Sequence, residues 1–333
     1  MKPVIIGIHG LGNKPPRKLL KKWWLKSIHE GLEKTGKDRL SIPFDLVYWA
    51  DVIHPVPLNP FIRNKEHLLY IDEKYGKSVP GKIDEKPSVK ARMLKYLEEQ
   101  LDKLFLNDDM SINFKNVTDK LIHRYFLDLE TYYGRNCMSV IESKCSVREV
   151  IQRRLLEKLK EYKDYKILLI AHSMGSIVSF DVLSNLQPGM SVHTFITIGS
   201  PLGFPVIVGQ IFAEQKEKNR KLKKPHAPDS ISGKWLNLSD FEDKVALDHT
   251  LADDYGKNSK GLIAEDILVY NDYEMNGLQN PHKSYGYLRT PELADVINEF
   301  LISRRTDRIY RGYKYSIKKV VSGIHHIKNV FKR

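Results

Sequence analysis

Residues Ile167 to Ser176 read Ile-Leu-Leu-Ile-Ala-His-Ser-Met-Gly-Ser, and they are the strongest indication of the fold class of the chain. Its first five residues are apolar with no polar face, which is typical of a strand buried on both sides of a parallel sheet. The strand runs directly into small-X-Ser-X-Gly, and a helical pattern follows at once. This order predicts a nucleophile elbow, a strained strand-to-helix turn that holds the Ser173 hydroxyl at the top of the sheet.

On both sides of these residues, short apolar runs alternate with helical patterns. The predicted strands are Val4–Ile8, Phe44–Trp49, Ile167–Ala171, Thr194–Ile198, Trp235–Leu238 and Ile267–Tyr270. The predicted helices are Arg17–Glu33, Val147–Tyr162, Ser176–Leu186 and Pro291–Ile302. Such alternation implies βαβ units, and therefore an α/β fold whose mostly parallel central sheet carries helices on both faces.

One long region interrupts the alternation. No strand is expected between Ile53 and Lys144, where two helical patterns, Val89–Leu106 and Val117–Tyr133, follow a proline-rich start. Insertions at the carboxyl ends of the strands border the ligand crevice. We therefore expect this region to be a helical cap that covers the active site, rather than an insertion that only adds to the packing of the core. The expected parts are a first core segment at 1–52, the cap at 53–144, a second core segment at 145–303 and a basic tail at 304–333.

A glycine-bearing loop follows the first predicted strand and reads His9-Gly10-Leu11-Gly12. Acyl transfer needs two N–H donors aimed at the oxyanion of the tetrahedral intermediate. One donor is the residue after the nucleophile, here Met174, and the other comes from a loop after an earlier strand. We expect the Leu11 N–H to be that second donor, with His9 and Gly10 ordering the loop.

The general base is expected at His282. In this arrangement the chain order is serine, then acid, then histidine. His282 lies after the last predicted strand and before the last predicted core helix. His172 is adjacent to Ser173, but neighbours on a sharp turn point apart, so we do not expect His172 to act as the base.

The acid of the triad has two candidates after the strand Trp235–Leu238. Asp243 is preferred because the loop has room there to turn back toward His282. Asp240, closer to the strand, is the second choice. Either carboxylate would fix the imidazole tautomer and stabilise the imidazolium.

These motifs together resemble the α/β-hydrolase superfamily of serine esterases and lipases. The Ala-His-Ser-Met-Gly form of the elbow is similar to serine lipases of the GPI inositol-deacylase-like group. The blocks that carry the resemblance are His9–Gly12, Ala171–Gly175, Gly199–Gly203, Trp235–Asn237 with Asp243, and Asn280–His282. The resemblance implies ester hydrolysis through an acyl-enzyme, with Ser173, Asp243 and His282 in the triad positions.

The formal net charge of +13 is unevenly distributed. From Arg304 to Arg333 ten Lys or Arg stand against one acid, Asp307, whereas the remaining chain carries 44 against 40. The nearly balanced body argues against a nucleic-acid-binding surface. Apolar residues in the tail recur every three or four positions, at Tyr313, Ile317, Val320, Ile324, Ile327 and Phe331. This stripe fits either an interfacial helix on anionic lipid or a final helix packed on the body.

Two cysteines, Cys137 and Cys145, predict neither a disulfide framework nor a zinc site. No apolar run approaches the roughly 20 residues of a membrane span, and the start reads as a strand rather than a signal peptide. The expected location is the cytoplasm, with peripheral membrane contact through residues 304–333 as an added possibility.

The leading hypothesis is a serine hydrolase that cleaves a small-molecule or lipid carboxylic ester and needs no metal or cofactor. An acyltransferase or a thioesterase uses the same machinery. The alternative of another class is a catalytically silent hydrolase-fold module that binds a membrane or a partner through its basic tail.

Overall fold

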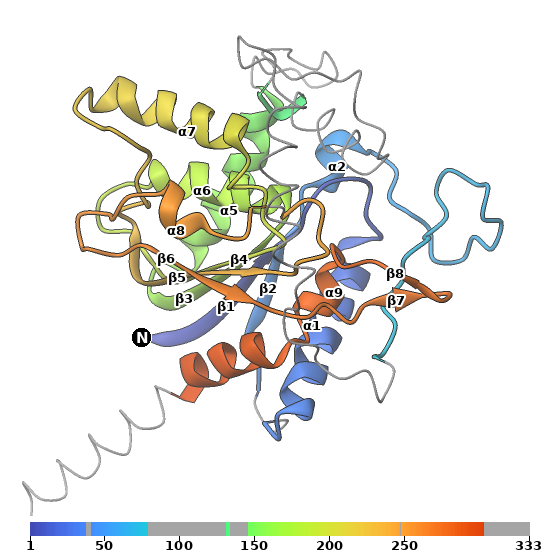
Figure 1. Cartoon of the computed structure of the whole chain (residues 1–333). Helices are drawn as coiled ribbons and strands as arrows, with labels where there is room; N and C mark the ends of the chain where they lie inside the picture. Colours follow the sequence, from blue (N-terminus) through green and yellow to red (C-terminus); the bar gives the residue numbers. More distant parts are fainter. Residues whose placement is uncertain (38–40, 79–130, 134–145, 247, 303–333) are drawn as a thin grey trace, which may run out of the picture.

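The computed structural model describes residues 1–37, 41–78, 131–133, 146–246 and 248–302. Its centre is a six-stranded sheet in the order β2-β1-β3-β4-β5-β6, with every neighbouring pair parallel (Figure 1). The strands are β1 (Lys2–Ile8), β2 (Phe44–Val47), β3 (Tyr165–His172), β4 (Val192–Ile198), β5 (Ile231–Ser239) and β6 (Ala264–Leu268). A small antiparallel hairpin, β7 (Glu274–Met275) and β8 (Leu278–Gln279), stands apart from this sheet. This is the sheet of the α/β-hydrolase fold, as expected.

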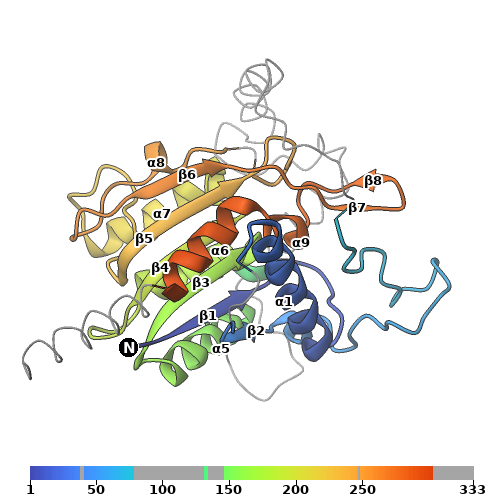
Figure 2. The same cartoon turned by 90° about the horizontal axis from the view of Figure 1, so that it is seen from below.

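Helices cover both faces of the sheet. The described helices are α1 (Arg17–Lys34), α2 (Ala50–Ile53), α5 (Val147–Glu161), α6 (Met174–Ser184), α7 (Pro205–Lys218), α8 (Leu251–Asp254), α9 (Ser284–Tyr287) and a last one at residues 291–302. Seen from below, α1 and the helix at 291–302 lie over one face of the strands (Figure 2). The helices α5 and α6 pack into the hydrophobic cluster of the other face.

Alternation along the strands builds these two cores, because successive side chains of a strand point to opposite faces. Along β3, Leu169 and Ala171 join the cluster under α5 and α6, whereas Leu168 and Ile170 join the cluster under α1. Both sets are buried, which explains why this strand shows no polar face in the sequence.

The order of the strands also places the site. The chain runs from β1 to its neighbour β2, and then β3 returns to the opposite side of β1. Ligand sites of open α/β sheets lie outside the carboxyl ends of the strands at such a reversal. The register pairs Ile8 with Ala171, so the loop after β1 and the turn after β3 leave the sheet side by side.

Several predicted boundaries need correction. The sixth strand is Ala264–Leu268 rather than Ile267–Tyr270, because it pairs with β5 through the polar residues Glu265 and Asp266, which interrupt the apolar pattern. The fifth strand begins at Ile231, earlier than predicted, and the helix after the elbow begins at Met174.

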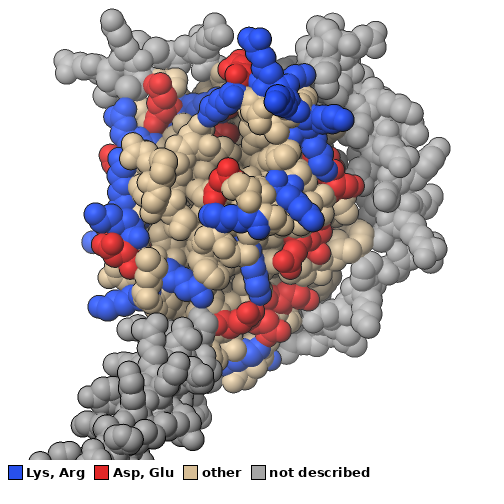
Figure 3. Space-filling view, turned by 90° about the vertical axis from the view of Figure 1, so that its left-hand side faces the viewer, with Lys and Arg blue, Asp and Glu red and all other residues tan. Residues whose placement is uncertain are grey.

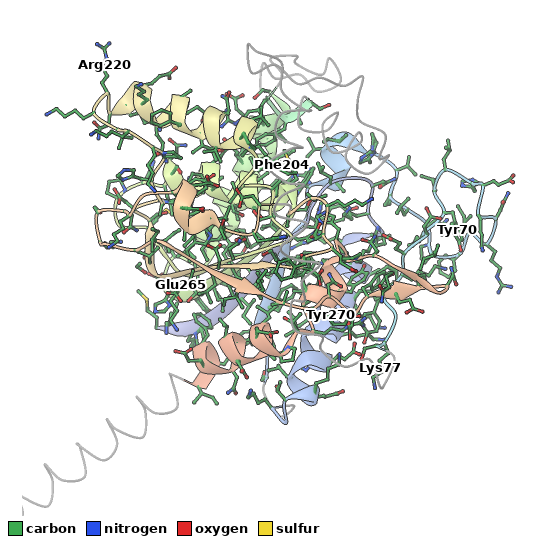
Figure 4. The ribbon with its side chains drawn as sticks, viewed as in Figure 1. Tyr70, Lys77, Phe204, Arg220, Glu265 and Tyr270 are labelled. Carbon is green, nitrogen blue, oxygen red and sulfur yellow. The ribbon has the colours of Figure 1, made fainter. Side chains whose placement is uncertain are left out.

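The helix α7 was missed altogether. Its first half is apolar, with Ile207 and Ile211 buried, but its second half is mostly polar. The apolar pattern typical of a helix therefore covers only about two turns, which is too short to predict the element. The labelled Phe204 and Arg220 mark the two ends of this helical region (Figure 4). Lys and Arg side chains gather along the upper rim of the face in Figure 3, where α7 ends. The cations of its last turn and of the segment that follows it are Lys216, Lys218, Arg220, Lys221, Lys223 and Lys224.

The predicted cap at 53–144 is described only in part. Residues 54–78 form turns and irregular chain, and residues 131–133 are helical. The Tyr132 hydroxyl donates to Asp181 at 2.8 Å, which attaches this end of the insertion to α6. The rest of the cap, the two cysteines and the tail at 304–333 lie outside the described residues. Among the helices that the structure describes, none has both the length and the apolar character of a membrane span.

Candidate active site

Ser173 occupies the turn between β3 and α6 in a conformation that side chains rarely adopt. Its φ is 54° and its ψ is −129°, and a non-glycine residue held there stores roughly 1–3 kcal/mol of backbone strain. The Ser173 N–H donates to the carbonyl of Ile198 at 3.1 Å, which ties the turn to the end of β4. Although Ser173 stands at the N-cap of α6, its hydroxyl makes no cap hydrogen bond. The hydroxyl is therefore available for another partner.

That partner is His282, which lies between the serine and an acid. The Nε2 atom of His282 is 3.0 Å from the Ser173 hydroxyl, and its Nδ1 atom is 2.9 Å from both carboxylate oxygens of Asp243. A carboxylate only accepts, so Nδ1 carries the proton and Nε2 accepts from the serine. The three side chains form one continuous hydrogen-bonded chain.

Asp243 is completely buried and has four donors around it. Besides His282, it accepts from the Tyr287 hydroxyl at 2.7 Å and from the N–H groups of Val245 and Ala246 at 2.9 and 3.3 Å. These bonds fix both carboxylate oxygens. Burial raises the pKa of Tyr287 well above its ordinary value, so this phenol remains a donor.

Asp240, the second candidate, lies elsewhere in the network. Its carboxylate accepts from the N–H of Glu242 at 2.8 Å and of Asn271 at 2.6 Å, and it makes no hydrogen bond to His282. Burial raises the pKa of Asp240 to about 6. Its backbone N–H donates to Tyr287 at 2.9 Å, so the same tyrosine joins both acids.

The loop after β1 lies against the serine. A Cβ atom added to Gly10 would stand 2.6 Å from the Cβ of Ser173, so only glycine permits this approach. Gly175 is equally constrained, because its added Cβ would lie 2.8 Å from the carbonyl oxygens of Ile8 and His9. The two glycines let β1, the loop and α6 meet around Ser173.

His9 holds one peptide of this loop in a fixed orientation. The Trp49 N–H donates to Nε2 of His9 at 3.0 Å, so Nδ1 must carry the proton and donate to the Gly10 carbonyl at 2.8 Å. That carbonyl belongs to the same trans peptide as the Leu11 N–H, which therefore points the opposite way. Burial lowers the pKa of His9 to about 3 and keeps the ring neutral.

Two N–H groups in the segments that meet around Ser173 are unengaged within the described part of the chain. Neither Leu11 nor Met174 donates its N–H to another described residue. Met174 is the first residue of α6, where N–H groups have no partner inside the helix and where the helix dipole favours negative charge. These two groups are the oxyanion donors expected from the sequence.

His172 was set aside as a base, and it does not contact the serine hydroxyl. It is nevertheless part of the site, since its Nε2 donates to the backbone carbonyl of His282 at 2.8 Å. Burial, and then the neighbouring imidazole of His282, lower the pKa of His172 well below its ordinary value. His172 is therefore a neutral support for the loop that carries His282.

A cavity of about 540 Å³ opens beside His282. The hairpin of β7 and β8 lines it, together with Glu242, Lys244 and four residues of the irregular segment, Lys65, Tyr70, Asp72 and Glu73. Charged and amide side chains make up much of its wall. Among the residues described, no group of three or more His, Cys, Asp or Glu is arranged to hold a metal ion.

The geometry defines an α/β-hydrolase fold with a serine, a histidine and an aspartate joined at the carboxyl ends of its strands. Residues 117–255 match the family model of the PGAP1-like alpha/beta domain, a hydrolase-type family. This stretch contains Ser173 and Asp243 but ends before His282. No curated protein matches the chain. The similarity supports a hydrolase in general.

Proposed function

We propose that this protein is a serine hydrolase that cleaves carboxylic esters through an acyl-enzyme on Ser173. The observation that carries the proposal is the continuous chain from Asp243 through His282 to Ser173, with bonds of 2.9 and 3.0 Å. These distances lie within the reach that general-base activation of a hydroxyl requires.

In the acylation step, the Ser173 oxygen bonds to the ester carbon while its proton moves to Nε2 of His282. The carbonyl electron pair goes onto oxygen, and the N–H groups of Leu11 and Met174 stabilise this oxyanion. The bond to the alkoxide then breaks, and His282 returns its proton to the leaving oxygen. Asp243 keeps the imidazole in the right tautomer and stabilises its charged form.

In the deacylation step, a water molecule gives a proton to His282 and attacks the acyl carbon. The second tetrahedral intermediate collapses with release of the acid, and Ser173 recovers its proton from His282. Each step uses side chains of this chain and water, so the proposed mechanism requires no metal or cofactor.

Hydrolysis of p-nitrophenyl esters from acetate to palmitate, with wild type and Ser173→Ala side by side, tests the proposal. We expect turnover by the wild type and a loss of about 10⁴-fold or more in the variant. Equal turnover by both proteins would refute the role of Ser173. The profile over chain length separates an esterase from a lipase, and added alcohols or thioesters test acyl transfer and thioester cleavage.

The membrane contact predicted for residues 304–333 lies outside the described residues and stays a prediction. Sedimentation with anionic liposomes, comparing the full chain with a chain ending at residue 303, tests it. Equal binding by both chains would remove the tail from this role.

A further inference from the structure

Residues 71–78 form a strap that is held against the body close to His282; the labelled Tyr70 stands just before it and the labelled Lys77 near its end (Figure 4). Ile71 is buried, and the Lys74 carbonyl accepts from the Tyr273 hydroxyl at 2.7 Å. The Gly76 carbonyl accepts from the buried Arg289 guanidinium at 2.6 Å. The strap belongs to the predicted insertion, and it is fixed to the core at several points.

Glu73 is the residue of the strap that reaches the loop of His282. One of its carboxylate oxygens accepts from Lys283 Nζ at 2.6 Å, and the other accepts from the side-chain amide of Asn280. These partners lie one residue after and two residues before His282. Glu73 therefore holds both sides of the turn that carries this histidine.

Asn280 connects Glu73 to the backbone of His282. Its Oδ1 accepts from the His282 backbone N–H at 3.0 Å, while its Nδ2 donates to Glu73. The backbone N–H can only donate, so the amide oxygen must face His282 and the amide nitrogen must find an acceptor. The carboxylate of Glu73 is that acceptor, and it favours the amide orientation in which the oxygen faces the His282 N–H.

Other groups fix the opposite side of the turn. The side-chain amide of Asn271 donates to the carbonyls of Pro281 and Lys283 at 2.6 and 2.9 Å, and His172 donates to the carbonyl of His282. The carbonyl groups of residues 281, 282 and 283 thus accept hydrogen bonds from side chains of the core. Among the described residues, the N–H of His282 donates to the side chain of Asn280, and the amide nitrogen of that side chain donates to Glu73. The backbone N–H of Asn280 donates to the Tyr273 carbonyl at 3.0 Å, so Glu73 fixes the side chain of Asn280 rather than its backbone.

We propose that Glu73 is a positioning residue for His282, which it holds between Asp243 and Ser173 through Asn280 and Lys283. The inference rests on the proposed function. Its physical basis is that proton transfer requires the imidazole at hydrogen-bond distance from both partners, and a misplacement of about 1 Å can lower the rate about 100-fold. Through Glu73, a segment of the insertion completes the catalytic geometry of the core.

The charge of Glu73 suits this role. Burial works against ionisation, but the charge of Lys283 and the hydrogen bonds from Lys283 and Asn280 outweigh it, and the pKa of Glu73 lies below its ordinary value. The carboxylate is therefore ionised, and both of its oxygens accept.

The test compares Glu73→Ala and Glu73→Gln with a matched control, Glu66→Ala, which removes an exposed carboxylate from the same irregular segment. The measurements are kcat and KM on a p-nitrophenyl ester, the rate of labelling by a fluorophosphonate, and thermal unfolding. We expect Glu73→Ala to lower kcat and the labelling rate about 10- to 100-fold with KM little changed. Glu73→Gln keeps an acceptor for Asn280 and should fall between, while Glu66→Ala should behave as wild type.

Several results would overturn the proposal. An unchanged kcat in Glu73→Ala with a lower unfolding temperature would make the residue merely structural, and a rise in KM alone would make it a substrate contact. If Glu73→Ala does not fold, Asn280→Ala must show the same loss of kcat for the proposal to stand. A wild type that the probe does not label defeats the proposed function instead, so the two failures are distinguishable.

Discussion

Asp243 and Asp240 lie only three positions apart, and their surroundings give them different roles. Asp243 contacts the imidazole of His282, whereas Asp240 ties the end of β5 to Asn271 beyond β6. Spacing in the sequence places both after the same strand and cannot choose between them. Which of the two carboxylates contacts the histidine depends on where the fold places Tyr287 and His282 against this loop, and the local sequence does not determine that placement.

Asp243→Asn should lower kcat about 10⁴-fold, because an amide donor facing Nδ1 favours the tautomer whose Nε2 already carries a proton. Asp240→Asn should keep kcat within a few-fold of wild type. It should instead reduce the free energy of unfolding by about 1–3 kcal/mol, since one of its two backbone donors loses its acceptor. Steady-state kinetics and urea unfolding of both variants check this. The opposite pattern, with turnover lost only in Asp240→Asn, would make Asp240 the acid of the triad.

Three residues of the site could not be identified from the sequence. Tyr287 and Glu73 act on partners far along the chain, and no local pattern marks such contacts. The position of His172 next to Ser173 places it near the site, but the sequence does not show that its ring supports the backbone of His282 rather than the serine hydroxyl. By contrast, the pairing of Ser173 with His282 follows from a strand-turn-helix pattern and from chain order, which are readable locally.

At the scale of elements, the carboxyl ends of the strands bring the site together. Gly199, directly after β4, has φ of +53°, and an added Cβ would lie 2.8 Å from an Asp243 oxygen and 3.2 Å from Nδ1 of His282. Gly189 also has a positive φ, of +89°, yet an added Cβ would meet nothing within 4 Å. An alanine at Gly189 would therefore strain only the backbone, whereas an alanine at Gly199 would also crowd the Asp243 and His282 side chains.

Gly199→Ala should lower kcat by at least 10-fold, because the methyl group must displace the acid or the base, and a misplacement of about 1 Å can cost about 100-fold. Gly189→Ala should cost about 1 kcal/mol of stability through its backbone conformation and leave kcat unchanged. Both variants are to be compared by kcat and by thermal unfolding. Equal kcat values in the two variants would mean that the end of β4 does not shape the site.

The elements themselves were largely predictable where burial is uniform. The strands β1 to β4 and the helices α1 and α5 show clear apolar periods, and Thr290 marks the start of the helix at 291–302 as an N-cap should. The strand β6 mixes acidic and apolar residues, and α7 is buried along only half of its length. In both, the tertiary neighbours rather than the local pattern decide the structure.

At the scale of the whole molecule, two buried neutral histidines link stability to pH. The pKa of His9 falls from 6.5 to about 3 on folding, so below pH 6.5 the unfolded chain binds a proton that the folded protein excludes. The free energy of unfolding then decreases as the pH falls, by about 1.4 kcal/mol per pH unit. His172 acts in the same direction. Asp240, with its pKa raised to about 6, acts in the opposite direction between its unfolded value of 3.8 and 6.

His9→Gln isolates one of these contributions, because glutamine can accept from Trp49 but does not titrate. The stability advantage of wild type over the variant should shrink by about 2 kcal/mol in total between pH 6.5 and 4.5. Other groups titrate in both proteins and cancel in the difference. Urea unfolding at a series of pH values measures it. Parallel stability curves would show that His9 is not a buried neutral group.

Covalent labelling shows whether Ser173 is the nucleophile of a hydrolase. A fluorophosphonate is added to wild type, Ser173→Ala and His282→Ala, and the modified residue is located by mass spectrometry of peptides. We expect a single adduct on Ser173 in wild type, none in Ser173→Ala, and labelling slowed by about 100-fold or more in His282→Ala. An adduct on another residue, or equal labelling of Ser173→Ala, would contradict this expectation.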